Sequence, residues 1–216
     1  MRSERTSKPI GLAIVGAGRI GLIRGEVAAK HPSVGWIGIA ETRADRAKEV
    51  AKWIGADFCT MDYRELLARP EATAAVIATD EHLHVDPILA AVEHGLDLMI
   101  EKPLATDLRE SAGILEAIQQ SGVDAVVGYT QRFRRRFLVA KEKVRMGQLG
   151  DVTLVTSRAF MNRLVALDNY RRTDHPERIS PMVISGTHAL DIVMWLLEGK
   201  IPLEIYARSV DQVLGP

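Results

Sequence analysis

The stretch IGLAIVGAGRIG, residues 10–21, joins an apolar run to three glycines in the spacing G-x-G-x-x-G. The apolar run is typical of a buried strand, and the residues after it begin a helical pattern. In a dinucleotide site, Gly16 makes the tight turn, Gly18 lets the backbone approach a pyrophosphate, and Gly21 lets the helix pack closely on the strand. A plain strand-to-helix turn also needs small residues, so the motif indicates a dinucleotide site only where it follows a strand and begins a helix. Both conditions are met here.

An acidic residue follows at the distance that such a site needs. Glu41 comes directly after the apolar run 34–40 and lies 20 residues after Gly21. A carboxylate there can accept hydrogen bonds from the ribose hydroxyls of NAD, and it repels the additional phosphate of NADP. Arg43 could bind that phosphate instead, although an exposed position in the first turn of a helix is its more ordinary role. The sequence therefore predicts NAD as the cofactor and leaves NADP open.

The first half of the chain alternates short apolar runs with helical patterns, which is typical of a parallel sheet with helices on both faces. The predicted strands are 10–15, 34–40, 74–78, 96–100 and 125–129. The predicted helices are 20–30, 44–54, 63–68, 84–93 and 108–120. We therefore predict an α/β fold with a doubly wound parallel sheet of the Rossmann type over residues 10–130. The polar start, residues 1–9, is expected to be disordered.

The pattern changes after residue 130, and we place a second domain at 131–216. It contains a predicted helix, a β-rich run, a polar irregular stretch, an apolar helix and a last strand: 137–146, 152–160, 162–177, 188–197 and 203–210. Two strands and their helices make a poor sheet. The second domain is therefore expected to be α+β, with an open and incomplete sheet that favours association between copies of the chain.

Composition excludes several classes of protein. The 28 basic and 28 acidic side chains give a formal charge of zero, which provides no drive toward nucleic acid or an anionic membrane. The basic run 132–136 lacks a larger basic context and is interpreted as a solvated linker. No apolar run approaches the ~20 residues of a membrane-spanning helix. The single Cys59 allows no internal disulfide, and with the six histidines it shows no metal-ligand spacing. We expect a cytoplasmic protein without a metal.

The stretch LDLMIEKP, residues 96–103, places an acid, a base and a proline directly after a predicted strand. At the C-terminal end of a strand in a doubly wound sheet, side chains face the place where ligands bind. Pro103 keeps Lys102 away from helical geometry and stiffens the backbone around it. Lys102 could then donate a hydrogen bond to a substrate oxygen and stabilise the charge that develops during hydride transfer. A lysine that only reaches solvent from the strand end is the alternative.

Five segments together resemble the Gfo/Idh/MocA family of nicotinamide-dependent oxidoreductases. They are the glycine turn, ATDEHLH at 78–84, EKP at 101–103, GYTQRF at 128–133 and GTHALD at 186–191. The resemblance runs from Ile10 onward. It implies a Rossmann domain, a second α/β domain whose open sheet often serves for oligomerisation, sugars or polyols as substrates, and a catalytic or substrate-binding role for Lys102. The implied cofactor-binding set is Gly16, Gly18, Arg19, Ile20, Gly21, Glu41, Arg43, Thr79, His84 and Glu101.

The apolar helix near the end of the chain carries the second half of the implied site. His188, Asp191 and Trp195 fall at i, i+3 and i+7 and so share one face. His188 is suited to remove a substrate hydroxyl proton near neutral pH while the lysine holds the oxygen. Asp191 would bind another hydroxyl or orient the histidine, and a capping histidine with a first-turn aspartate is the alternative. By family position Gln131 and Arg132 border the site, where Arg132 contacts substrate or braces the hinge between domains.

Two departures from the family pattern bear on activity. Many members have an aspartate four residues before the histidine, where this chain has Ile184, which can neither tune a base nor bind a hydroxyl. Asp80 and Glu81 replace the usual proline and small polar residue after Thr79. The chain also ends at Pro216, short of the usual family length, so a truncated second domain is expected.

Two functions are consistent with these observations. The favoured one, because Lys102 and His188 are retained, is NAD-dependent hydride transfer between the nicotinamide and a secondary alcohol or carbonyl of a sugar, an inositol-like polyol or a related compound. The alternative is a dinucleotide-binding protein without catalysis, such as a sensor or a subunit of an assembly. The expected partners are a small-molecule substrate and further copies of the same chain.

Overall fold

The computed structural model describes residues 9–160, 162–172, 178 and 180–210. The chain divides into two compact units, one that ends at Gly128 and one that begins at Tyr129. Disorder was expected for residues 1–9. Residues 1–8 of this segment lie outside the described residues, and Pro9 is described.

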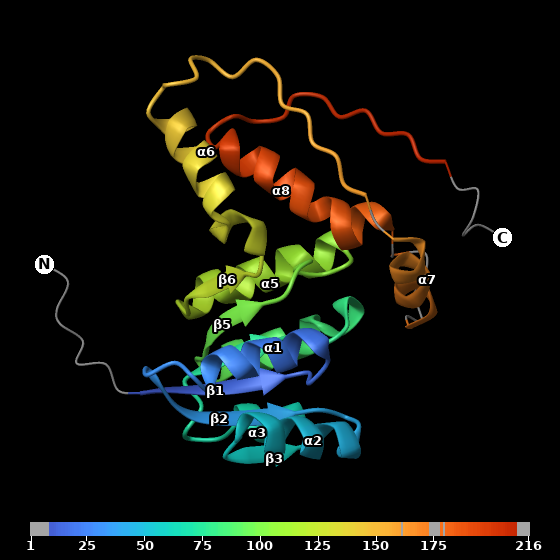
Figure 1. Ribbon diagram of the computed structural model, residues 1–216. Helices are drawn as coiled ribbons and strands as arrows, with labels where there is room; N and C mark the ends of the chain where they lie inside the picture. Colours follow the sequence, from blue (N-terminus) through green and yellow to red (C-terminus); the bar gives the residue numbers. More distant parts are fainter. Residues whose placement is uncertain (1–8, 161, 173–177, 179, 211–216) are drawn as a thin grey trace, which may run out of the picture. The chain divides into compact units, whose positions relative to one another are not determined.

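A parallel sheet of six strands forms the centre of the first unit, in the order β3-β2-β1-β4-β5-β6 (Figure 1). The strands are β1 (Ile10–Val15), β2 (Val34–Ala40), β3 (Phe58–Thr60), β4 (Ala74–Ile77), β5 (Asp97–Ile100) and β6 (Ala125–Val127). This topology confirms the predicted α/β fold with a doubly wound sheet. The strand β3 was not predicted, because three residues that are half-buried or exposed are too few to show a periodic pattern.

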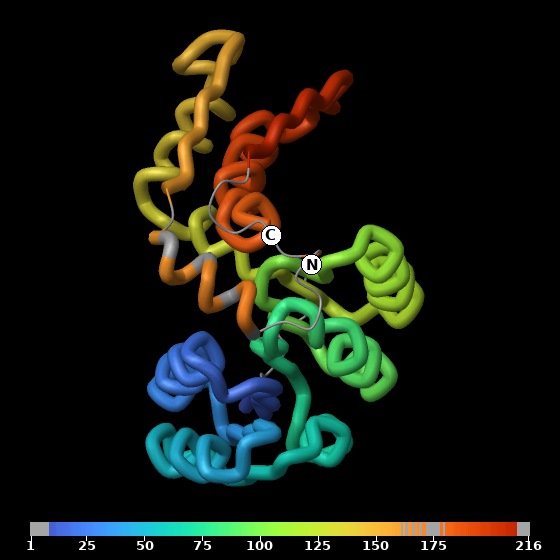
Figure 2. Tube along the Cα trace, turned by 90° about the vertical axis from the view of Figure 1, so that its right-hand side faces the viewer, coloured from blue at the N-terminus to red at the C-terminus, as the bar shows by residue number. Residues whose placement is uncertain are grey.

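Helices cover both faces of this sheet, as Figure 2 shows. One face carries α1 (Arg19–Ala28) and α2 (Ala44–Ile54), and the other carries α3 (Tyr63–Leu67), α4 (Val85–Glu93) and α5 (Leu108–Ser121). Successive strand residues point to opposite faces, so Ile14 packs in the cluster under α1 and α2 while Val15 packs in the other. Burial on both faces is the reason why the central strands are apolar throughout instead of alternating.

The order of the strands determines where a ligand can bind. From β1 the chain moves outward to β2 and β3, and it then returns to β4 on the other side of β1. Ligands of doubly wound sheets bind beyond the carboxyl ends of the strands at this reversal. The glycine turn follows β1, Thr79 comes shortly after β4, and Glu101 follows β5 directly. The predicted cofactor residues of the first unit thus lie at one end of the sheet.

All the regular secondary structure of the second unit in the described residues is helical. Its elements are η2 (Thr130–Phe133), α6 (Arg135–Arg145), α7 (Arg163–Arg172), the π-helical turn η4 (Met182–Gly186) and α8 (Thr187–Leu196). The helices α6 and α8 confirm two predictions. The helix α7 falls in the stretch 162–177 that was predicted to be irregular, and that prediction was wrong, because a polar segment of good helix formers need not show an apolar stripe. None of the described helices is long and apolar enough to cross a membrane.

The strands predicted at 152–160 and 203–210 are wrong for the described residues, and the open sheet expected there is not formed by them. Residues of high β propensity make a segment able to enter a sheet, but a strand also needs a neighbour for its N–H and C=O groups. None of the described strands pairs with either segment. Leu154, Phe160, Leu203 and Ile205 are accordingly exposed.

Candidate functional site

The turn between β1 and α1 depends on glycine for two different reasons. Gly16 has a φ of 93°, and a Cβ on it would lie 2.6 Å from the Ala78 carbonyl oxygen. A Cβ on Gly21 would overlap the Gly16 carbonyl oxygen. By contrast, a Cβ on Gly18 would meet nothing within 4 Å. Gly16 and Gly21 are therefore needed for the fold, whereas Gly18 leaves open space at the start of α1.

That space lies at a helix terminus suited to an anion. Gly18 is the N-cap of α1 without a side-chain cap, and the first turn contains no acidic residue. The first N–H groups of a helix lack intrahelical partners, and the helix dipole places partial positive charge there. Arg19 is exposed and Ile20 is half-buried in this first turn. These features fit the pyrophosphate of a dinucleotide.

The carboxylate of Glu41 is bound to the glycine turn. Its Oε2 accepts a hydrogen bond of 3.0 Å from the backbone N–H of Ala17, and its Oε1 accepts from the backbone and Nε of Arg43, both at 3.2 Å. The Glu41 side chain is 10% exposed and that of Arg43 is 70% exposed. Glu41, which was predicted to bind ribose, therefore lies beside the glycine turn, and Arg43 lies between its carboxylate and the solvent.

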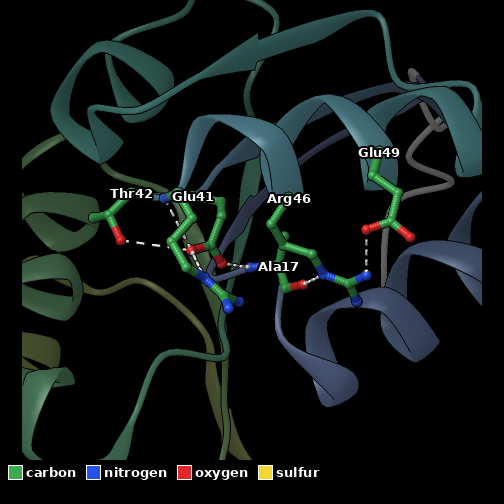
Figure 3. A network of polar contacts seen from close by, with 6 residues as sticks. Ala17, Glu41, Thr42, Arg46 and Glu49 are labelled. Atoms are coloured by element: carbon green, nitrogen blue, oxygen red, sulfur yellow. Dashed lines mark hydrogen bonds and ion pairs between the residues drawn. The ribbon is translucent and has the colours of Figure 1, made fainter.

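A second side chain holds the same turn from the opposite direction, as Figure 3 shows. The Nε of Arg46 donates a hydrogen bond of 2.9 Å to the Ala17 carbonyl oxygen, and its Nη1 pairs with Glu49 at 2.9 Å. Both backbone groups of Ala17 are thus bound by side chains from the segment after β2. Arg46 was missed from sequence, although its place in the first turn of α2, five residues after Glu41, was a usable signal.

His84 is buried between two carbonyl oxygens near the Lys102 segment. Its Nδ1 lies 2.9 Å from the Pro103 oxygen and its Nε2 lies 3.3 Å from the Thr79 oxygen. Burial lowers the pKa of His84, and the two carbonyl oxygens offset part of that shift. The neutral ring carries one N–H and donates to one of the carbonyls at a time. His84 and Thr79 thus link the end of β4 to the backbone just after Lys102.

Glu101 is held by a residue that sequence reasoning missed. Arg24, from the middle of α1, donates from Nε at 3.0 Å and from Nη2 at 2.5 Å to the Oε1 of Glu101. Glu101 was predicted to bind the cofactor. It is buried, and the ion pair with Arg24 compensates for the loss of water around its carboxylate. Arg24 lies three residues after Gly21, on the same side of the helix, and this spacing could have been noticed. Lys102, the next residue, is half-buried.

In the second unit, Arg132 and Asp191 bind each other. The Nε of Arg132 lies 2.9 Å and 3.1 Å from the two carboxylate oxygens of Asp191, and its Nη2 lies 2.5 Å from one of them. The hydrogen bond to Asp191 raises the pKa of Arg132 above its ordinary value. The Asp191 side chain is 7% exposed and that of Arg132 is 40% exposed. Two residues predicted to contact substrate are therefore also partners of each other.

The aromatic side chains of Tyr129 and Trp195 lie near that ion pair. The Tyr129 and His188 rings meet edge to face at 6.1 Å, and the Tyr129 hydroxyl lies 3.1 Å from Thr187 Oγ1. The Arg132 guanidinium lies 5.8 Å from the Trp195 ring. The Oε1 of Gln131 is buried, with no hydrogen-bond partner among the described residues. Ile184, in η4, is buried as well, at the position four residues before His188 where an acid was expected.

Metal ligands are not grouped in the part of the chain that the structure describes. No set of three or more His, Cys, Asp or Glu side chains lies in position there to hold a metal ion.

Comparison with known proteins identifies the family of this chain. Residues 10–129 match the model of the family GFO_IDH_MocA, described as "Oxidoreductase family, NAD-binding Rossmann fold". The chain belongs to this family. The predicted family and the NAD-binding Rossmann fold are thereby confirmed.

Among curated relatives are inositol dehydrogenases. The chain is 30% identical to scyllo-inositol 2-dehydrogenase (NAD(+)) of Bacillus subtilis (strain 168), over 64% of this chain and 41% of that protein. It is 30% identical to an inositol 2-dehydrogenase of Gluconacetobacter diazotrophicus, over 88% of this chain and 55% of that protein. It is 32% identical to "Uncharacterized oxidoreductase YrbE" of Bacillus subtilis (strain 168), over 94% of this chain and 58% of that protein. The chain thus spans about half the length of the curated relatives it matches.

A solved structure has the same fold. It is a scyllo-inositol dehydrogenase from Lactobacillus casei with bound NAD(H) and scyllo-inositol, with a TM-score of 0.75 and 22% identity. The match covers 88% of this chain and 56% of that one.

Proposed function

We propose that this chain works in an NAD-dependent oxidoreductase that transfers hydride between the nicotinamide and a secondary alcohol or carbonyl of a sugar, an inositol-like polyol or a related compound. The observation that carries the proposal is the Glu41 carboxylate bound to the glycine turn. The relatives named as inositol dehydrogenases support the substrate class. The first unit would hold the cofactor, and the second unit would provide substrate contacts and contacts between copies.

The first unit has the groups that a dinucleotide needs. The open space at Gly18 and the uncapped start of α1, with Arg19 and Ile20, would receive the pyrophosphate. Glu41 would accept hydrogen bonds from the ribose hydroxyls. Thr79, His84 and Glu101 would border the nicotinamide side of the site. When bound, NAD supplies the acceptor or donor of the hydride.

The preference for NAD over NADP follows from Glu41 and Arg43. A buried carboxylate beside the ribose repels the additional phosphate of NADP. Arg43 is bound to that carboxylate through its backbone and its side chain, which supports a role in holding Glu41 more than a role in binding phosphate. We therefore propose NAD as the cofactor and expect weaker binding of NADP.

The remaining residues of the proposed mechanism would bind the substrate and transfer its proton. Lys102 would donate a hydrogen bond to the reacting oxygen and stabilise its developing negative charge. His188 would take the hydroxyl proton in oxidation and return it in reduction. Asp191 and Arg132 would act as a pair, in which the arginine holds the carboxylate and leaves it oriented toward a substrate hydroxyl. Gln131, with its buried Oε1, would contribute a further acceptor.

We also propose that the protein is cytoplasmic and self-associates. The exposed thiol of Cys59 suits a reducing compartment. The exposed apolar side chains at 152–160 and 201–210 support association through the second unit. The formal charge of zero gives no support to a nucleic-acid partner.

One observation favours a second candidate, a dinucleotide-binding protein without catalysis. Ile184 is 6% exposed where many family members have an aspartate, so it can neither assist His188 nor bind a hydroxyl. In this alternative the cofactor site is kept and turnover is absent.

The test is a calorimetric titration of the 216-residue chain with NAD and with NADP, followed by turnover measurements with inositols and sugars. Binding of NAD, with turnover that is lost in Lys102→Ala and kept in Lys48→Ala, is the expected result. Lys48 is exposed on α2 and serves as the matched control. Binding of NAD without turnover would favour the second candidate, and absence of binding to either dinucleotide would overturn both.

A further inference from the structure

The ion pair between Arg24 and Glu101 connects two elements that are remote in sequence. The two residues are 77 positions apart, and their side chains are 23% and 11% exposed. Both N–H groups of Arg24 converge on the Oε1 of Glu101. Such charge-assisted bonds are stronger than neutral ones, and together they hold the Oε1 of Glu101 in place. Helix α1, which begins at the glycine turn, is thereby bound to the residue before Lys102.

Gly128 closes the other side of the same carboxylate. A Cβ on Gly128 would lie 3.2 Å from both carboxylate oxygens of Glu101 and 3.3 Å from its Cδ. Three atoms at nearly equal distance mean that the carboxylate faces the position that a Cβ of residue 128 would occupy. The backbone there cannot move away freely, because the Gly128 N–H donates a 2.7 Å hydrogen bond to the Ile100 carbonyl oxygen. The absence of a side chain at position 128 therefore allows the orientation that Arg24 imposes.

The backbone on each side of Lys102 is held as well. The Glu101 N–H donates to the Ile77 carbonyl oxygen at 2.9 Å, which ties the position before Lys102 to β4. His84 lies 2.9 Å from the Pro103 carbonyl oxygen, which ties the position after it. The Glu101 side chain is a third anchor of this backbone, because Arg24 binds its carboxylate from α1. Gly128 leaves room for the carboxylate in that position.

We infer that Arg24 is a positioning residue for the reaction: with Gly128 it holds Glu101, and through Glu101 it sets the direction of Lys102 toward the substrate. The inference rests on the proposed oxidoreductase function for its catalytic consequence. A displacement of about 1 Å at a reacting group can cost on the order of 100-fold in rate, so a side chain that does not touch substrate can still control turnover. A purely structural ion pair would change stability and leave the rate of the folded fraction unchanged.

The experiment compares Arg24→Gln, Arg24→Lys and Gly128→Ala with two matched controls. Arg69→Gln removes a half-buried arginine that pairs with Glu71 away from Lys102, and Gly113→Ala adds a methyl group where nothing lies within 4 Å. Per folded molecule, we expect kcat to fall on the order of 10- to 100-fold in Arg24→Gln and by a smaller factor, about 3- to 10-fold, in Gly128→Ala, where the Glu101 carboxylate has to shift by only a few tenths of an ångström. The Kd for NAD should stay within about 3-fold of wild type in both variants. Arg24→Lys should recover part of kcat, and both controls should match wild type.

A spectroscopic readout keeps the inference separate from the proposed function. Lysines are dimethylated by reductive methylation with carbon-13 formaldehyde and a borane reductant, and the methyl resonances are recorded by NMR. The Lys102 resonance is identified by its absence in Lys102→Arg. It should shift in Arg24→Gln, which removes a charge, and also in Gly128→Ala, which removes none. Unchanged Lys102 resonances in both variants, or kcat equal to wild type in both, would overturn the inference. If wild type neither binds NAD nor turns over, the proposed function fails, and the resonance shifts alone decide whether Arg24 positions Lys102.

Discussion

Replacing Gly18 by alanine should weaken NAD binding while the chain stays folded. The new methyl group meets no protein atom within 4 Å, so the fold has room for it. Alanine is a poorer N-cap than glycine, which costs about 0.5–1 kcal/mol. For a chain of this size that corresponds to a fall in Tm of about 1–4 °C.

The same methyl group would occupy the space in which the pyrophosphate approaches the start of α1. Loss of one charge-assisted hydrogen bond from these N–H groups is worth about 1.5–3 kcal/mol, which is about 10- to 150-fold in Kd. Calorimetric titration with NAD measures this change, and thermal unfolding of the same samples measures Tm.

Gly21→Ala is the comparison that separates the two roles of glycine. Its Cβ would overlap the Gly16 carbonyl oxygen, so α1 has to move away from β1. We expect a cost near the upper end of the about 1–3 kcal/mol typical of overpacking, of which the helix propensity of alanine returns at most about 1 kcal/mol. The fall in Tm should therefore exceed that of Gly18→Ala. If Gly18→Ala binds NAD as wild type does, or loses more stability than Gly21→Ala, the reasoning about this turn is refuted.

Three further predictions concern single side chains. Glu41→Gln should weaken NAD binding about 5- to 30-fold, because a charge-assisted hydrogen bond becomes a neutral one, and titration should show NADP gaining relative to NAD. His84→Gln should flatten the pH dependence of stability: burial lowers the pKa of His84 from 6.5, so the unfolded chain binds its proton more readily, and the free energy of unfolding of wild type falls as pH decreases below about 6.5. Arg132→Ala should lower the free energy of urea unfolding of the second unit by about 1–3 kcal/mol, because the buried carboxylate of Asp191 loses its cation.

Each of these has an outcome that counts against it. Equal loss of NAD and NADP affinity in Glu41→Gln would mean that the carboxylate only supports the turn. A pH profile of unfolding in His84→Gln that runs parallel to wild type would assign the effect to other histidines. Arg135 is exposed in the same basic run, so a destabilisation in Arg135→Ala as large as that in Arg132→Ala would show that the ion pair adds nothing specific.

The first unit was largely predictable because its signals are local. Each strand that is buried on both faces has a continuous apolar run, and the glycine turn combines its strand, its spacing and its helix within the dozen residues 10–21. Where the signal was too short, as in β3, the prediction failed. In the second unit the residues at 152–160 and 203–210 favour strands but are insufficient to form one, because pairing requires a neighbouring strand that no local pattern specifies.

The candidate site was predictable by residue type and less so by contact. Glu41 was expected to bind ribose, but its hydrogen bond to Ala17 depends on how β2 lies beside β1. Asp191 was expected to face substrate, and the structure pairs it with Arg132, 59 residues away. Arg24 was not considered, since its spacing from Gly21 indicates only the side of α1 on which it lies and not the acid that it binds.

The sequence by itself determined the Rossmann fold of the first unit, the family and the residue types at the site, because periodicity and motif spacing act within short continuous segments. Only the tertiary structure decided which partner each charged side chain has. Arg24 pairs with Glu101, Arg132 pairs with Asp191, and Glu41 binds the backbone of the glycine turn. The physical reason is range. Ion pairs and hydrogen bonds act over a few ångströms, so they form only after packed helices and strands bring distant parts of the chain together.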